Sequence, residues 1–313
     1  MDNRVFPESR DKQIEFILSE LDQLHPKSEV EKHAIEENVL FFKSLRSVLV
    51  YVRWLYGLRK HIQGENLLEI NELLPSLDEV FHAKMAEIER RPRPGIIRPV
   101  VDYITKLASD GSEEKRLRVA SLCSGSMEAE RQSIELVQQI GNTTRRLTIV
   151  GFDISPHTRA FAEKNLGKLT NIRVVRETRL TEERLSALEQ ETEEPILVVI
   201  SDNDIFTLAS DFSSHAFDLV MTSLFLHHLD EVGRTELIEH MKVLAPRVLN
   251  YDGYQNEVVI PILSLTGWHS PVFLNAAIFS TIRFPSRTQV LGLHSGAQID
   301  FYNHGHYRAI FSS

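Results

Sequence analysis

The chain has 313 residues, of which 42% are hydrophobic and 25% charged, a composition typical of globular proteins that excludes wholesale disorder. Its formal charge of −9 disfavours a nucleic-acid partner, because a net negative charge repels polyanions. The single cysteine, Cys123, excludes an intramolecular disulfide and a cysteine-based zinc site. The N-terminus is too polar for a secretory signal and the apolar runs are too short for a membrane span, so we expect a cytoplasmic protein.

Residues 1–110 are expected to form an all-α domain or lid. Apolar residues recur at helical spacing over 14–24 and again over 41–55. Further helices are predicted over 77–90, where a proline-rich run ends the pattern, and over 96–107. The 41–55 stretch is apolar nearly all round, which is typical of a helix in an internal core, and a homodimer interface or a substrate lid is the alternative.

Residues 111–313 follow a different pattern, in which short β-branched or apolar runs alternate with amphipathic helical stretches. Such alternation predicts βαβ units and a mostly parallel sheet, since parallel neighbours need a crossover connection. We therefore expect a second domain of the α/β class, with a helical insertion near 257–284. The predicted strands are 118–122, 147–153, 196–200, 217–222 and 247–251, with helices over 128–140 and 156–166.

Small and acidic side chains stand where these predicted strands end. The first strand leads into a short turn around Gly125, where small residues let a ligand approach the backbone at a helix N-terminus. The second ends in Asp153, a carboxylate suited to the hydroxyls of a ribose, although it could instead cap the next helix. The third is followed by Asp202 and Asp204, either of which suits an adenine amino group or is a plain loop acid. Because ligands bind at the carboxyl ends of parallel strands, we expect one nucleoside site.

This ordered series resembles the class I S-adenosylmethionine-dependent methyltransferase superfamily, small-molecule branch, from residue 116 onward. Its glycine-rich motif is similar to 121–127, its third motif matches Asp202 and Asn203, and the segment after its fourth strand is similar to 217–229. The resemblance implies a Rossmann-like fold with a mostly parallel seven-stranded sheet and an antiparallel C-terminal strand within 298–311. The cofactor site that it implies consists of Ser121, Cys123, Ser124, Gly125, Asp153, Ile154, Asp202, Asn203 and Ser223.

The resemblance further implies methyl transfer from S-adenosylmethionine to oxygen, nitrogen or carbon of a small-molecule acceptor. We expect no metal site, because the sequence shows no cluster of three or four ligand residues. His227 and His228 are the candidate catalytic residues, since a histidine near neutral pH can take the proton of an attacking group. A role in the pocket wall is the alternative for both. Asp252 and Tyr254 follow the fifth predicted strand and are candidate substrate contacts, whereas a plain Asp-Gly turn is the competing interpretation.

The sequence also departs from the family pattern. Ser121 stands at the usual position of an acidic residue, and Cys123 and Met127 stand where two of three glycines are usual. The interval from Asp153 to Asp202 is long, and we interpret 176–194 as a charged surface insertion. The eroded first motif leaves a non-catalytic S-adenosylmethionine-binding or scaffolding protein as an alternative, and a nicotinamide-dependent dehydrogenase is disfavoured because its G-x-G-x-x-G fingerprint is absent.

Overall fold

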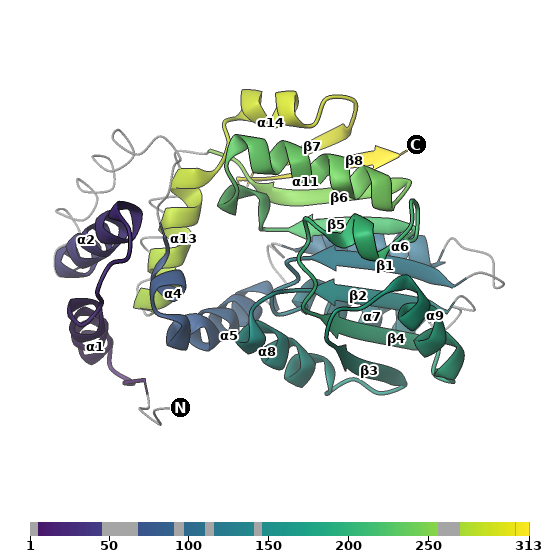
Figure 1. The fold of residues 1–313 in the computed structure, drawn as a ribbon, viewed down its shortest axis with the longest axis horizontal. Helices are drawn as coiled ribbons and strands as arrows, with labels where there is room; N and C mark the ends of the chain where they lie inside the picture. The colour runs from purple at the N-terminus through teal and green to yellow at the C-terminus, as the bar shows by residue number, and fades with distance from the viewer. Residues whose placement is uncertain are drawn as a thin grey trace. The chain divides into compact units, whose positions relative to one another are not determined.

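A computed structural model describes residues 6–45, 68–90, 97–109, 116–140, 146–255, 270–303 and 305–312. The chain divides into two compact units (Figure 1): the first is Met1–Lys84 with Gln255–Pro285, the second Met85–Tyr254 with Ser286–Ser313. The division therefore falls at residue 84, ahead of the boundary expected near 110, and the first unit also takes in the segment expected as a helical insertion. None of the helices in the described ranges has the length and apolarity needed to cross a membrane.

The described part of the first unit is helical. Its elements are α1 (Arg10–Asp22), α2 (Glu29–Ser44), α4 (Ile70–Leu73), η1 (Pro75–Leu77), the first half of α5 (Asp78–Glu89) and α13 (Pro271–Arg283). The helix predicted over 14–24 is confirmed, and it buries Ile14, Ile17 and Leu21. These residues pack with Phe41 and with apolar side chains of α13, so distant segments of the chain share one core. Most of the helix predicted over 41–55 lies outside the described residues.

The second unit is built on a mixed sheet, which in the described residues has eight strands in the order β3-β4-β2-β1-β5-β6-β8-β7. The strands from β1 to β6 are parallel, and β8 runs antiparallel to both β6 and β7. The strands are β1 (Leu117–Leu122), β2 (Leu147–Phe152), β3 (Ile172–Glu177), β4 (Ile196–Ser201), β5 (Leu219–Ser223), β6 (Arg247–Gly253), β7 (Gln298–Tyr302) and β8 (His306–Ser312). The predicted α/β fold is confirmed.

Helices cover both faces of this sheet (Figure 1). One core joins the sheet to α6 (Arg98–Ser109), α7 (Glu128–Ile140) and α8 (Pro156–Leu166). The other core joins it to α9 (Glu182–Glu191), α10 (Leu208–Asp211) and α11 (Glu231–Leu244). Helix α14 (Arg287–Leu293) packs through Val290 against the β7–β8 hairpin. Buried on both faces, the central strands read as continuous apolar runs, which explains why their bounds could be predicted closely.

The strand in excess of the seven expected is β3, which forms one edge of the sheet. Its sequence carries Arg173 and Arg176, and charged side chains on an edge strand hinder pairing with another chain. The segment 176–194 is therefore no simple surface insertion: it holds the end of β3 and all of α9. Glu189 of α9 forms an ion pair with Arg118 of β1 at 2.6 Å, which attaches α9 to the central sheet.

Helix α7 buries an acid beneath the sheet. The Glu130 side chain is 2% exposed, and the Ser121 hydroxyl on β1 donates a hydrogen bond to its carboxyl group. Burial, which outweighs this hydrogen bond, raises the pKa of Glu130 to about 7. A carboxyl group whose pKa is raised on folding keeps its proton in the native state after the unfolded chain has lost it. Stability therefore falls as pH rises from about 4.5 towards about 7.

Replacing Glu130 with Gln, which mimics the neutral carboxyl group, should remove this pH dependence. Relative to wild type, E130Q should gain stability between pH 5 and pH 8, by up to about 3 kcal/mol at about 1.4 kcal/mol per pKa unit. Urea unfolding at a series of pH values measures the difference, with E193Q at an exposed position as the matched control. Parallel pH profiles for wild type and E130Q would contradict the raised pKa.

Candidate functional site

The turn between β1 and α7 is bent by three residues with left-handed backbone conformations, Cys123 (φ 50°), Gly125 (φ 55°) and Met127 (φ 52°). Only Gly125 adopts this conformation without steric cost. The Met127 side chain is fully buried, and Gly151 of β2 accommodates it. A Cβ at Gly151 would lie 2.6 Å from the Met127 Sδ atom and 2.8 Å from the Ser124 Oγ atom. Met127 thus fits in the turn only because Gly151 of the neighbouring strand has no side chain.

Asp153 follows β2 and joins the turn to the next loop. Its carboxylate accepts hydrogen bonds from the backbone N–H of Gly125 at 3.1 Å and from that of Ser155 at 2.9 Å. The Ser155 side chain, and not Asp153, caps α8 by accepting from the N–H of Thr158. Asp153 therefore stands beside the glycine turn as predicted. The following residue, Ile154, leaves an apolar side chain 73% exposed at this edge of the sheet.

The two residues predicted to bind adenine differ in their surroundings. Asp202 accepts the Arg179 N–H at 2.9 Å and lies 3.5 Å from the Arg159 guanidinium, with its side chain 29% exposed. Asn203 is buried, and its amide accepts from the Leu180 N–H and donates to the Leu180 carbonyl and to Asp211. The Asn203 side chain thus holds the loop that follows β3. Its oxygen also accepts from the Ser201 hydroxyl, so the amide has no capacity left for a ligand.

The serines and the cysteine of the first motif also separate into different environments. Ser121 is 1% exposed and bonds to Glu130 under the sheet, so its hydroxyl does not face the strand ends. Burial, followed by the charges of Asp153 and Asp204, raises the pKa of the Cys123 thiol. A protonated thiol is a poor nucleophile, which supports the interpretation of Cys123 as a packing residue in the turn.

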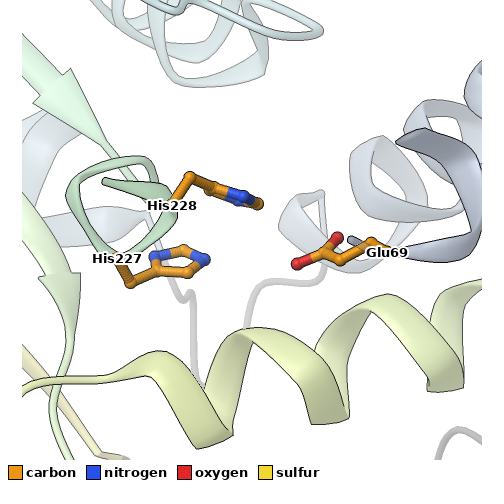
Figure 2. Close-up of side chains that lie close together, drawn as sticks. All are labelled: Glu69, His227 and His228. Carbon is orange, nitrogen blue, oxygen red and sulfur yellow. The ribbon is translucent and has the colours of Figure 1, made fainter. Parts of the chain in front are cut away.

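His227 and His228 lie on a short 3-10 turn, η2 (Leu226–His228), which follows β5 (Figure 2). The chain reaches this turn from Ser223, at the end of β5, through Leu224 at φ 56°. The His227 Nδ1 atom is 2.7 Å from the Asp252 Oδ1 atom, and the backbone N–H of His227 donates to the Asp252 Oδ2 atom at 2.9 Å. The two imidazole rings lie 4.3 Å apart between centroids.

Asp252 is buried on β6, where its carboxylate contacts His227, and its role as a substrate contact stays a prediction. Burial alone would raise the pKa of Asp252, but the charge of His227 and hydrogen bonds from His227 and Gly253 lower it. The ionised carboxylate thus orients the imidazole ring through Nδ1. Alternation along β6 explains the outcome, because Asp252 and its neighbour Tyr251 must point to opposite faces.

Tyr254, the second predicted substrate contact, packs against the C-terminal hairpin. Its hydroxyl donates to the Tyr302 carbonyl at 3.3 Å, and its ring lies edge-on to that of Phe301 at 5.1 Å. Tyr251 is fully buried on β6, and its ring stacks on that of His306 with 5.5 Å between the centroids. The contacts of Tyr254 with Tyr302 and Phe301 make it part of the packing of the β7–β8 hairpin.

Glu89, the last residue of α5, also lies at the turn after β1. The Ser126 hydroxyl donates to the Glu89 Oε2 atom at 3.3 Å, and the Gln132 side chain donates to the Glu89 carbonyl at 3.0 Å. No motif marks Glu89 in the sequence, since it is one acid among many on a polar helix end. Only the packing of α5 against α7 brings it to the turn.

No protein-family model matches this sequence, and no curated protein matches it. Among solved structures, the CurJ carbon methyltransferase is similar over 97% of this chain and 71% of its own, at 13% identity and a TM-score of 0.50. An O-methyltransferase family protein from Burkholderia thailandensis is similar over 91% of this chain and 72% of its own, at 16% identity and a TM-score of 0.49. The likeness to CurJ and the order of the parallel strands agree with the architecture expected from the sequence. The chain has the fold of the class I S-adenosylmethionine-dependent methyltransferases.

Proposed function

We propose that this protein is an S-adenosylmethionine-dependent methyltransferase that acts on a small-molecule acceptor. The observation that carries the proposal is the hydrogen bond between Asp153 and the Gly125 N–H, at the adjacent carboxyl ends of β1 and β2. It sets a carboxylate for ribose hydroxyls next to a turn that ends at a helix N-terminus, which suits a nucleoside with a charged amino-acid tail.

The cofactor contacts follow from this arrangement. Asp153 binds the ribose hydroxyls, and the exposed Ile154 covers an apolar face of the adenine ring. Asp202 accepts from the adenine amino group, whereas Asn203 acts indirectly by holding the loop after β3. Backbone groups around Ser124 and Gly125 bind the amino-acid end, and Ser121 and Cys123 support the turn from below.

S-adenosylmethionine supplies a methyl group on a sulfonium, which is already activated for in-line attack. The protein contributes alignment of the acceptor and removal of its proton. We assign the general base to His227: Asp252 engages Nδ1, and Nε2 would take the proton of an oxygen or nitrogen acceptor. His228 lies beside His227 and contacts the acceptor.

Replacing Asp153 with Ala should abolish binding of S-adenosylmethionine and of its product, S-adenosylhomocysteine, in titration calorimetry. The variant loses both the ribose acceptor and the carboxylate that fixes Gly125. The matched control is D102A, which removes an exposed acid paired with Arg98 on α6. Thermal unfolding shows whether each variant is folded. Unchanged affinity in a folded D153A protein would overturn the assignment.

Turnover is tested by incubating the protein with methyl-labelled cofactor and a panel of phenols, amines and carboxylic acids. For an oxygen or nitrogen acceptor, H227Q should lower kcat by about 100-fold or more with little change in cofactor affinity. D252N should lower it less, because it removes only the orientation and charge stabilisation of His227. A larger loss in H228Q than in H227Q would transfer the base to His228. Cofactor binding without turnover of any acceptor would favour the non-catalytic alternative.

A further inference from the structure

A carboxylate from outside the strand–turn–helix motif lies at the amino-acid end of the proposed cofactor site. Two contacts fix Glu89 there: its carbonyl accepts from Gln132 on α7, and its side chain accepts from the Ser126 hydroxyl in the turn. The backbone of the helix end and its carboxylate are thus both held against the same strand–turn–helix junction. A side chain fixed in this way has little conformational entropy left to lose on binding a ligand.

The charge of this carboxylate also reaches β6. Burial is the main cause of the raised pKa of Tyr251, and the charge of Glu89 adds to it. Tyr251 of β6 pairs with Ser223, the last residue of β5, and β5 in turn pairs with β1. Glu89 therefore lies close enough to β6 for its charge to act on Tyr251, beside the end of β5.

The other acids close to this turn have different partners. Glu128 is engaged by Arg90, Arg131 and Asn165, and Glu130 is buried beneath the sheet at Ser121. Asp153 and Glu89 each accept a hydrogen bond from the 123–127 turn, Asp153 from the Gly125 N–H and Glu89 from the Ser126 hydroxyl. Asp153 lies on the β2 side, where the ribose is assigned, so Glu89 is the acid on the amino-acid side.

We propose that Glu89 binds the α-ammonium group of the cofactor's amino-acid end, and that the N-terminal end of α7 receives its carboxylate. The chemistry is complementary: helix N–H groups favour an anion, and a carboxylate favours a cationic donor. Glu89 is then a cofactor-specificity residue supplied by α5, and its position replaces the carboxylate that β1 lacks at Ser121. This inference rests on the proposed function.

The test pairs a variant with a modified ligand. Wild type and E89Q are titrated with S-adenosylhomocysteine and with its deaminated analogue, which keeps the carboxylate but has no ammonium group. Wild type should bind the deaminated analogue about 10- to 100-fold more weakly than S-adenosylhomocysteine, the range expected for a charge-assisted hydrogen bond. E89Q should bind the two ligands with nearly equal affinity, because the group that discriminates between them is gone.

The control variant is E87Q, which changes an exposed acid on the same helix and should behave as wild type. Thermal unfolding verifies that E89Q is folded, and E89D should restore part of the discrimination. If folded E89Q binds S-adenosylhomocysteine as wild type does, or weakens both ligands equally, the assignment of Glu89 is overturned. Failure of wild type to bind S-adenosylhomocysteine at all would instead overturn the proposed function.

Discussion

Parallel pairing of β1 with β2 and β5 brings the residues that follow these strands to one edge of the sheet. Within that edge, the Asp153 carboxylate binds the N–H of Gly125 and so couples the second strand to the first turn. The turn is otherwise unfavourable, since Cys123 and Met127 adopt left-handed conformations that cost non-glycine residues free energy. Packing of Met127 over Gly151 and the hydrogen bond to Asp153 hold this turn in place.

The added strand β3 changes how the adenine end of the site is built. Its following loop directs the Arg179 N–H to Asp202 and the Leu180 backbone to Asn203. An acid and an amide that look equivalent in the sequence therefore have separate functions, one still partly exposed and the other committed to the fold. The loop after β3 is thus part of the wall of the proposed site, and the long interval between Asp153 and Asp202 supplies this loop.

A similar separation occurs at β6, where Tyr251 and Asp252 are neighbours in sequence but belong to opposite faces. Asp252 contacts His227, whereas Tyr251 stacks on His306 of β8. The catalytic proposal depends on this geometry, because a histidine oriented by a buried carboxylate is held in one tautomer. A shift of β6 by one residue in its pairing register would move Tyr251 and Asp252 each to the opposite face of the sheet.

The sequence by itself determined the class of fold, the central strands and the position of Asp153. Long apolar runs and strand-end residues are local signals, and parallel pairing converts their order into proximity. Only the tertiary structure decided the roles of Ser121, Asn203 and Asp252, and it alone revealed Glu89 and Glu130. These outcomes depend on which face a side chain occupies and on contacts between distant segments. The edge strand β3 was not predicted for a related reason. It is only half-buried and carries charged side chains, so it lacks the apolar pattern of the central strands.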